Sequence, residues 1–120
     1  MQIGIDVGAT KIESVVLEDD GKEHNRRRTA CPKEYNQIIK TVKEINDSLE
    51  KTYNKNLPIG VCHPGIHSPQ TGLVKNAPNC FWLEKKPFQQ DLRKSLDKEV
   101  FCENDANCFA LSESIDGSGK

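Results

Sequence analysis

The stretch QIGIDVGATKIESVVL, residues 2–17, predicts how the chain begins to fold. Its first part alternates apolar and polar side chains up to Val7, which is typical of a strand with one buried face. A second apolar run, residues 12–17, begins only a few residues later, which is hairpin spacing. A turn at residues 19–21 leads into the polar stretch Lys22–Ala30, which fits an edge strand. We therefore expect three strands in meander order.

The rest of the chain alternates between helical and extended patterns. Residues 35–49 repeat apolar side chains with a period of about 3.6 residues and predict the first helix. LPIGVC, residues 57–62, predicts a short buried strand that runs into a turn at Pro64 and Gly65. The segment after Pro87 repeats apolar residues at helical spacing. Residues 99–102 are extended, and a third helix is expected from near Asp105. This order predicts an α/β domain with helices packed on a mixed sheet.

Composition and charge narrow the classes of function. The length of 120 residues fits one domain. Lys and Arg total 17 against 18 acidic residues, and no long block of one sign occurs, which argues against a nucleic acid or a membrane surface as partner. No apolar run approaches the ~20 residues of a membrane span, and the N-terminus does not resemble a signal peptide. We expect a cytoplasmic protein that binds small ligands.

Cysteines and histidines do not form a metal-binding pattern. The cysteine count is 5, an odd number, and no pair has C-x-x-C spacing. His63 and His67 are separated by Pro64 and Gly65, which prevent them from sharing a helical face. We therefore expect small buried or half-buried thiols rather than a disulfide or zinc framework, and no metal site built from protein side chains.

The segment DVGATK, Asp6–Lys11, at the tip of the predicted hairpin is the first candidate binding site. Its small residues allow close approach to the backbone, whose amides can turn inward to bind an anion. Thr10 adds a hydroxyl group. A carboxylate beside a phosphate, here Asp6, usually acts through Mg²⁺ or its waters. The alternative is an ordinary turn with residues chosen for backbone reasons.

The segment ENDANCFALSE, residues 103–113, crowds polar groups where a helix is expected to begin. Asn104 or Asp105 could cap that helix, and capping needs only one of them. A carboxylate at the junction of a strand and a helix is also held rigidly, as a general base should be. The amide of Asn104 can donate to and accept from a hydroxyl group, which suits a polyol. Helix capping remains the alternative.

A long loop, residues 61–82, is the third candidate. Its prolines and glycines predict a connection too long to be only a turn, and long ordered loops often bind ligands. Asn76 and Asn79 supply amides, and Trp82 supplies an aromatic ring. Amides with an aromatic face are a common way to hold sugars. A surface loop without function is the alternative.

Taken together, these segments resemble the N-terminal half of the ROK family of sugar kinases over nearly the whole chain. IGIDVGATK resembles the first phosphate motif of the family, commonly D-x-G-G-T-K, with Ala9 in place of the second glycine. HPG, residues 63–65, resembles its G-x-P-G sugar loop, with Cys62 where a glycine is usual. LVKNAPNCFW, residues 73–82, resembles its asparagine loop, and ENDANCFALSE its catalytic segment.

The resemblance implies a fold, cofactors and site residues. The fold is an α/β, actin-like (ribonuclease H-like) ATPase domain, with a mixed sheet, an N-terminal strand meander and flanking helices. Asp105 would be the catalytic base that accepts the proton of a sugar hydroxyl as it attacks the γ-phosphoryl group of ATP, with Mg²⁺ as a second cofactor. The implied sugar ligands are Gly65, Asn79, Asn104 and Asp105. The residues implied to face the ATP phosphates are Asp6, Gly8, Ala9, Thr10 and Lys11.

The resemblance also implies a two-lobed enzyme. Residues 1–120 would be its N-terminal lobe, and the C-terminal lobe, with further sugar ligands, the adenosine site and the zinc motif of the family, would be absent. Zinc is therefore expected only in that lobe, and residues 1–120 alone are expected to be inactive because half the cleft is lacking.

The acceptor is left open between several sugars. We expect an ATP-dependent hexose kinase of the fructokinase and mannokinase branch, acting on fructose, mannose or glucose, and a homodimer would fit an exposed lobe face. An N-acetylglucosamine kinase of the same family is the first alternative, and a non-catalytic sugar-binding or regulatory domain is the second. A sugar-responsive repressor of this family fits poorly, because Asp6 leaves no room before it for a DNA-binding helix-turn-helix.

Overall fold

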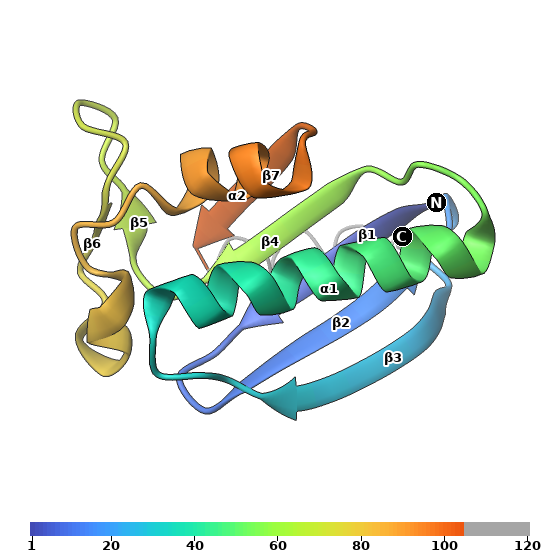
Figure 1. The fold of residues 1–120 in the computed structure, drawn as a ribbon, viewed down its shortest axis with the longest axis horizontal. Helices are drawn as coiled ribbons and strands as arrows, with labels where there is room; N and C mark the ends of the chain where they lie inside the picture. Colours follow the sequence, from blue (N-terminus) through green and yellow to red (C-terminus); the bar gives the residue numbers. More distant parts are fainter. Residues whose placement is uncertain (105–120) are drawn as a thin grey trace.

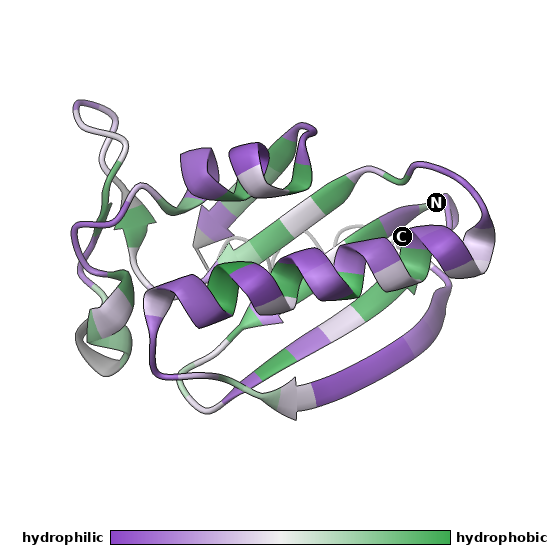
Figure 2. Cartoon of the chain, viewed as in Figure 1, coloured by the Kyte–Doolittle hydropathy of each residue, from purple (hydrophilic) through white to green (hydrophobic). Residues whose placement is uncertain are grey.

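The predicted meander is the start of the sheet in the computed structural model, which describes residues 1–104 except the side chains of His67, Pro78, Asn79 and Asn104. Strands β1 (Gln2–Val7) and β2 (Lys11–Leu17) pair antiparallel, with Ile3 opposite Val16 and Val7 opposite Ile12. Strand β3 (Glu23–Ala30) pairs antiparallel with β2 and forms one edge of the sheet. Its polar surface, purple in Figure 2, suits an edge that must not pair with another chain.

Two later strands extend the sheet on the other side of β1. Strand β4 (Ile59–His63) pairs parallel with β1, and β7 (Val100–Asn104) pairs parallel with β4. The order is therefore β3-β2-β1-β4-β7, a mixed sheet as expected. Because β1, β4 and β7 run in the same direction, their carboxyl ends lie along the same edge of the sheet. We call this the carboxyl edge.

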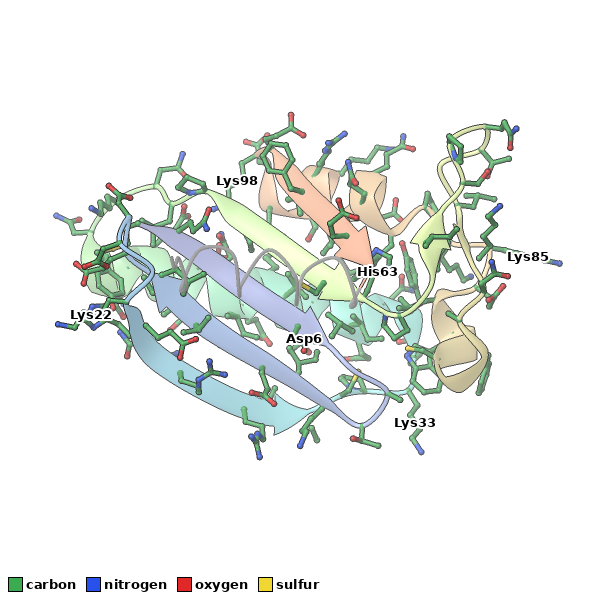
Figure 3. The ribbon with its side chains drawn as sticks, turned by 180° about the vertical axis from the view of Figure 1, so that it is seen from behind. Asp6, Lys22, Lys33, His63, Lys85 and Lys98 are labelled. Atoms are coloured by element: carbon green, nitrogen blue, oxygen red, sulfur yellow. The ribbon has the colours of Figure 1, made fainter. Side chains whose placement is uncertain are left out.

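Two helices cover one face of the sheet (Figure 1). Helix α1 (Tyr35–Tyr53) and helix α2 (Phe88–Leu96) pack against each other, α1 also contacts β1, and α2 also contacts β7. Alternate strand residues point into this layer and are buried. The buried apolar residues of the five strands are Ile3, Ile5, Val7, Ile12, Val16, Ile59, Val61 and Val100. Asp6 belongs to the other set of alternate positions and lies on the face away from the helices (Figure 3).

Helix α1 is longer than the apolar pattern predicts. It begins after Glu34, whose side chain accepts from the amide of Asn36, and it ends at Asn54, which adopts a left-handed conformation with φ 54°. An asparagine is one of the few residues that tolerate this conformation at a helix end. The predicted end at Leu49 was therefore too early, because polar residues of the last turn hide the helical period.

An ion pair closes the end of the molecule opposite the carboxyl edge. Glu50 of α1 accepts from the amide of Leu57 at 2.8 Å and from the ammonium of Lys98 at 2.9 Å. Lys98 also donates to the carbonyl of Leu57. Burial would raise the pKa of Glu50, but these two donors together hold it below its ordinary value. The last turn of α1 is thus fixed to the segments that enter β4 and β7.

The loop between β4 and α2 is ordered by backbone hydrogen bonds. It contains a two-stranded sheet of β5 (Ile66–His67) and β6 (Val74–Lys75), followed by the 3₁₀ helix η1 (Pro78–Leu83). Val74 exchanges hydrogen bonds with the segment between η1 and α2, donating to the carbonyl of Lys86 at 3.0 Å and accepting from the amide of Lys85 at 2.7 Å. The expected third helix near Asp105 lies outside the described residues.

The cysteines only partly match the expectation of thiols. Cys31, Cys80 and Cys102 are thiols that form no disulfide, and burial raises the pKa of the Cys102 thiol to about 12. Cys62 is disulfide-bonded, so the expectation is wrong there. Within residues 1–104 no cluster of His, Cys, Asp or Glu side chains is arranged to hold a metal ion. In the same part of the chain no helix has the length and apolar character needed to cross a membrane.

Candidate functional site

The carboxyl edge brings together the segments that the sequence predicts to act together. Asp6 on β1 lies beside Cys62 on β4, and Cys62 lies beside Glu103 on β7. Two strand spacings therefore separate Asp6 from β7, a distance of about 10 Å. Asp6 and His63 lie toward this edge in Figure 3, whereas Lys22 and Lys98 lie toward the other end. Ligands of open α/β sheets commonly bind outside the carboxyl ends of the strands.

The turn between β1 and β2, which we call the first turn, leaves two backbone amides available. The amide of Gly8 donates to the carbonyl of Lys11 at 2.8 Å and closes the turn. The amides of Ala9 and Thr10 donate to no other group within the described chain. The expectation that all amides of residues 8–11 can bind an anion is therefore too broad, because the amide of Gly8 is already used. Two adjacent free amides, with an exposed threonine hydroxyl, still fit a phosphate oxygen.

Close packing explains the glycine of the first turn. A Cβ atom on Gly8 would lie 3.0 Å from the carbonyl oxygen of Lys11, the acceptor that closes the turn. The carbonyl of Thr10 accepts from the amide of Cys31 at 2.9 Å, which attaches the turn to the end of β3. The Lys11 side chain is exposed beside it. The turn is thus held from both sides while the amides of Ala9 and Thr10 remain without a partner in the described chain.

Asp6 lies in a row of charged side chains that sequence analysis did not anticipate. It faces Glu13 across the β1–β2 pair, and Glu13 faces Arg28 across the β2–β3 pair. Glu13 accepts from Arg26 at 3.2 Å and pairs with Arg28 at 3.5 Å, whereas no salt bridge to Asp6 forms within residues 1–104. The two arginines offset the repulsion between neighbouring carboxylates. Asp6 remains exposed and available to a cation, which fits the implied Mg²⁺ or its waters.

The expected turn after β4 is confirmed and tightly packed. Gly65 has φ +78°, a conformation that favours glycine, and its Cβ would lie 2.5 Å from the carbonyl oxygen of Lys75. No side chain fits there, so the backbone of β6 can approach the turn closely. Asn79 lies in η1, which follows directly, and its side chain is not described. The structure therefore places the two implied sugar segments in one ordered loop.

Phe81, rather than Trp82, presents the aromatic surface of this loop. The two rings pack edge to face with centroids 5.0 Å apart, but Trp82 is half-buried and Phe81 is 71% exposed. The sequence favoured the tryptophan because of its residue type. Which of the two rings is exposed depends on the conformation of η1, whose backbone is non-helical at Cys80, and no pattern along the chain predicts this kink.

The end of β7 is the third wall of the candidate site. Asn104, its last residue, lies directly beside His63 of β4. Asp105 follows Asn104 and lies outside the described residues, as does the rest of the segment expected to be catalytic.

A family model described as the ROK family matches residues 2–120. The chain belongs to the ROK family. N-acetyl-D-glucosamine kinase of Pasteurella multocida is 37% identical over 117 residues, which are 97% of this chain and 38% of that protein. A ROK glucokinase from Streptomyces griseus, solved with glucose and AMPPNP, superimposes with a TM-score of 0.84 at 25% identity, over 99% of this chain and 38% of that one. An inorganic polyphosphate/ATP-glucomannokinase from Arthrobacter gives 0.83 at 28% identity, over 99% and 49%.

These matches establish the fold class and show how much of each relative's length the chain spans. The ROK chain has the actin-like ATPase fold of sugar kinases, in agreement with the mixed sheet and its flanking helices. It spans 38% of the length of the Pasteurella relative and of the Streptomyces structure. The Pasteurella relative and these two structures are sugar kinases.

Proposed function

We propose that residues 1–120 form the N-terminal lobe of an ATP-dependent sugar kinase. The observation that supports this most directly is the carboxyl edge. It holds a turn with two free amides and an exposed carboxylate about two strand spacings, roughly 10 Å, from the strand that ends in Asn104. A transferring phosphoryl group and its acceptor hydroxyl must lie between such walls.

Each segment of the edge has a role in this proposal. The amides of Ala9 and Thr10 hold phosphate oxygens, with Lys11 as a further positive charge and Gly8 closing the turn. Asp6 holds Mg²⁺ through its waters. ATP and Mg²⁺, when bound, supply the phosphoryl group and neutralise the charge that develops on it.

The sugar is held by the other two segments. Gly65 and Asn79 contribute from the ordered loop, and Asn104 contributes from the end of β7. Asp105 accepts the proton of the attacking hydroxyl as general base. Because phosphoryl transfer depends mainly on position and charge, holding the sugar hydroxyl in line is the main work of this lobe.

We propose N-acetylglucosamine as the first acceptor to test. Curated relatives at 37% and 35% identity are N-acetyl-D-glucosamine kinases, whereas the glucokinase and glucomannokinase structures share 25% and 28% with this chain. This ordering reverses our expectation from the sequence, which put fructose, mannose and glucose first. Glucose and mannose remain the second group, and fructose follows.

A comparison of acceptors tests the proposal. In the two-lobed enzyme, ATP-dependent phosphorylation of N-acetylglucosamine should exceed that of glucose, mannose and fructose, measured as kcat/KM in a coupled assay. Residues 1–120 alone should show no turnover, because the other wall of the cleft is needed to exclude water. Phosphorylation of none of the four sugars by the two-lobed enzyme would contradict the proposed function.

A further inference from the structure

His63, which no motif of the chain assigned to a role, is a fully buried polar residue at the carboxyl edge. Its side chain has 0% exposure, and the other buried polar residues within residues 1–104 are Ser14 and Asn46. An apolar side chain would fill such a site at lower cost, since a buried polar group is favourable only when its hydrogen bonds are made. The contacts of the ring therefore indicate what the histidine is for.

The ring of His63 is held by an aromatic neighbour from α2. Its plane meets that of Phe88 edge to face, at 5.5 Å between centroids and 86°. Phe88 in turn packs against Tyr35 of α1 at 6.2 Å. The Tyr35 hydroxyl donates to Asp91 of α2 at 2.6 Å, and burial followed by this bond raises the pKa of Tyr35. Both helices thus contribute to the packing that holds the imidazole in place.

The imidazole is tethered to the turn that follows β4. Nδ1 lies 2.8 Å from the carbonyl oxygen of Pro64. A carbonyl oxygen can only accept, so Nδ1 carries the proton in this contact. Burial lowers the pKa of His63, while the Pro64 hydrogen bond and the charge of Glu103 oppose that shift. The neutral ring with its proton on Nδ1 is therefore the form that the site favours at neutral pH.

Pro64 connects the His63 ring to the loop that is proposed to hold the sugar. The next residue, Gly65, packs so closely on β6 that an added Cβ would lie 2.5 Å from the carbonyl oxygen of Lys75 and 3.0 Å from the Cβ of Ala77. Ala77 immediately precedes η1, which contains Asn79. A displaced Pro64 carbonyl would therefore move the Gly65 turn, and with it the start of η1.

We propose that His63 is a positioning residue for sugar binding, acting through the Pro64 carbonyl on the loop of residues 64–79. This inference rests on the proposed function, because it takes that loop to hold the sugar. The imidazole does not touch the sugar. It fixes the orientation of the turn by a hydrogen bond that an aliphatic side chain of similar size cannot make.

Two substitutions separate the hydrogen bond from the packing. His63→Leu keeps an apolar body against Phe88 but removes the donor. His63→Asn is smaller but places an amide N–H near the position of Nδ1. His24→Leu is the matched control, because His24 lies on β3, pairs with Glu18 at 2.7 Å and has no contact with the loop.

The readouts are N-acetylglucosamine and AMPPNP titrations by NMR on the two-lobed enzyme, together with amide exchange of Ser68, Gly72 and Val74. We expect His63→Leu to weaken sugar binding about tenfold, since small misplacements of a binding loop are costly. Nucleotide binding should change less than about twofold, and exchange in the loop should accelerate. His63→Asn should restore sugar binding to within about threefold, because the donated hydrogen bond is regained. A two-bond ¹H–¹⁵N spectrum should show the proton on Nδ1.

Several outcomes would overturn the proposal. One is unchanged sugar binding and loop exchange in His63→Leu, and another is an equal loss in the Leu and Asn variants, which would make packing the only role. If His63→Leu does not fold, sugar binding by His63→Asn near the wild-type level still supports the tether, and a tenfold loss contradicts it. If the wild-type two-lobed enzyme binds no sugar, the proposed function fails, whereas loop exchange still decides whether His63 holds the turn.

Discussion

The two hairpin turns of the meander differ in the side chains that surround their free backbone amides. The first turn leaves the amides of Ala9 and Thr10 without a partner in the described chain, beside an exposed threonine hydroxyl. The second turn, residues 18–22, also leaves two amides without a partner in that part of the chain, those of Asp19 and Asp20. The carboxylates of these two residues repel an anion, whereas free amides among small, uncharged side chains can bind one.

The surroundings of the two turns strengthen this contrast. The first turn lies at the carboxyl edge beside Asp6, whereas the second lies at the other end of the sheet, where Asp19 pairs with the N-terminal ammonium at 2.6 Å. Both turns contain a glycine and have an aspartate nearby, so the glycine does not distinguish them. The side chains beside their free amides and the direction of the neighbouring strands do.

The largest expected effect tests whether the first turn faces a catalytic carboxylate. In the two-lobed enzyme, Asp105→Asn keeps size and capping ability but removes proton acceptance, so kcat should fall by roughly 10²- to 10⁴-fold with a much smaller change in sugar affinity. Steady-state kinetics with a thermal melt measure both. If Asp105 only caps a helix, asparagine is nearly as good there, and a variant with normal stability and near wild-type kcat would remove Asp105 from the mechanism.

The next effect compares the turns directly. Thr10→Ala removes a hydroxyl donor from the first turn, so the KM for ATP should rise about tenfold in the two-lobed enzyme, as expected for a lost bond to a charged group. The KM for the sugar should stay within about twofold of wild type. Asp20→Ala is the control in the second turn and should leave both values unchanged. Equal losses on both substrates in Thr10→Ala would mean that the first turn is only structural.

Alanine substitutions of Gly21 in the second turn and Gly8 in the first turn should differ in their effects on stability and on nucleotide binding. Gly21 has φ 88°, so Gly21→Ala should destabilise the fold by about 1–2 kcal/mol without affecting nucleotide binding. Gly8 does not have positive φ, but its new methyl group would lie 3.0 Å from the Lys11 carbonyl and shift the first turn. Gly8→Ala should therefore weaken AMPPNP binding by about threefold or more, with a smaller loss of stability. Urea unfolding and nucleotide titration of both variants measure stability and AMPPNP affinity. If both variants lose stability and affinity to the same extent, the two turns do not differ in function.

The smallest effect concerns pH. Because burial lowers the pKa of His63 below its unfolded value, the unfolded chain binds a proton more readily, and stability is lost as pH falls below about 6.5. The thermal melting temperature should therefore drop between pH 7.5 and pH 5.5, and His63→Asn should show a smaller drop because it has no proton to gain. The charge of Glu103 works against the shift, so the difference should be a few degrees, about 1 kcal/mol or less. An identical pH dependence in the two proteins would exclude this linkage.

The sequence by itself determined the elements whose patterns are local. Alternation in residues 2–17 predicted the first hairpin, and the apolar period of residues 35–49 predicted α1, because burial on one face leaves a repeat that neighbours along the chain reveal. The turn at Gly65 was predicted from the neighbouring Pro64 and from the glycine itself, which is also a local signal. The ROK resemblance likewise depended on short segments and is confirmed by the family match.

Only the tertiary structure decided which of these segments share a site and how. The parallel pairing of β1, β4 and β7 placed Asp6 two strand spacings from the strand that ends in Asn104, although nearly 100 residues lie between them in the chain. The arginines around Glu13 and the packing of His63 against Phe88 depend on contacts between distant segments. A side chain's burial and partners are properties of the packed layers, and no periodicity along the chain encodes them.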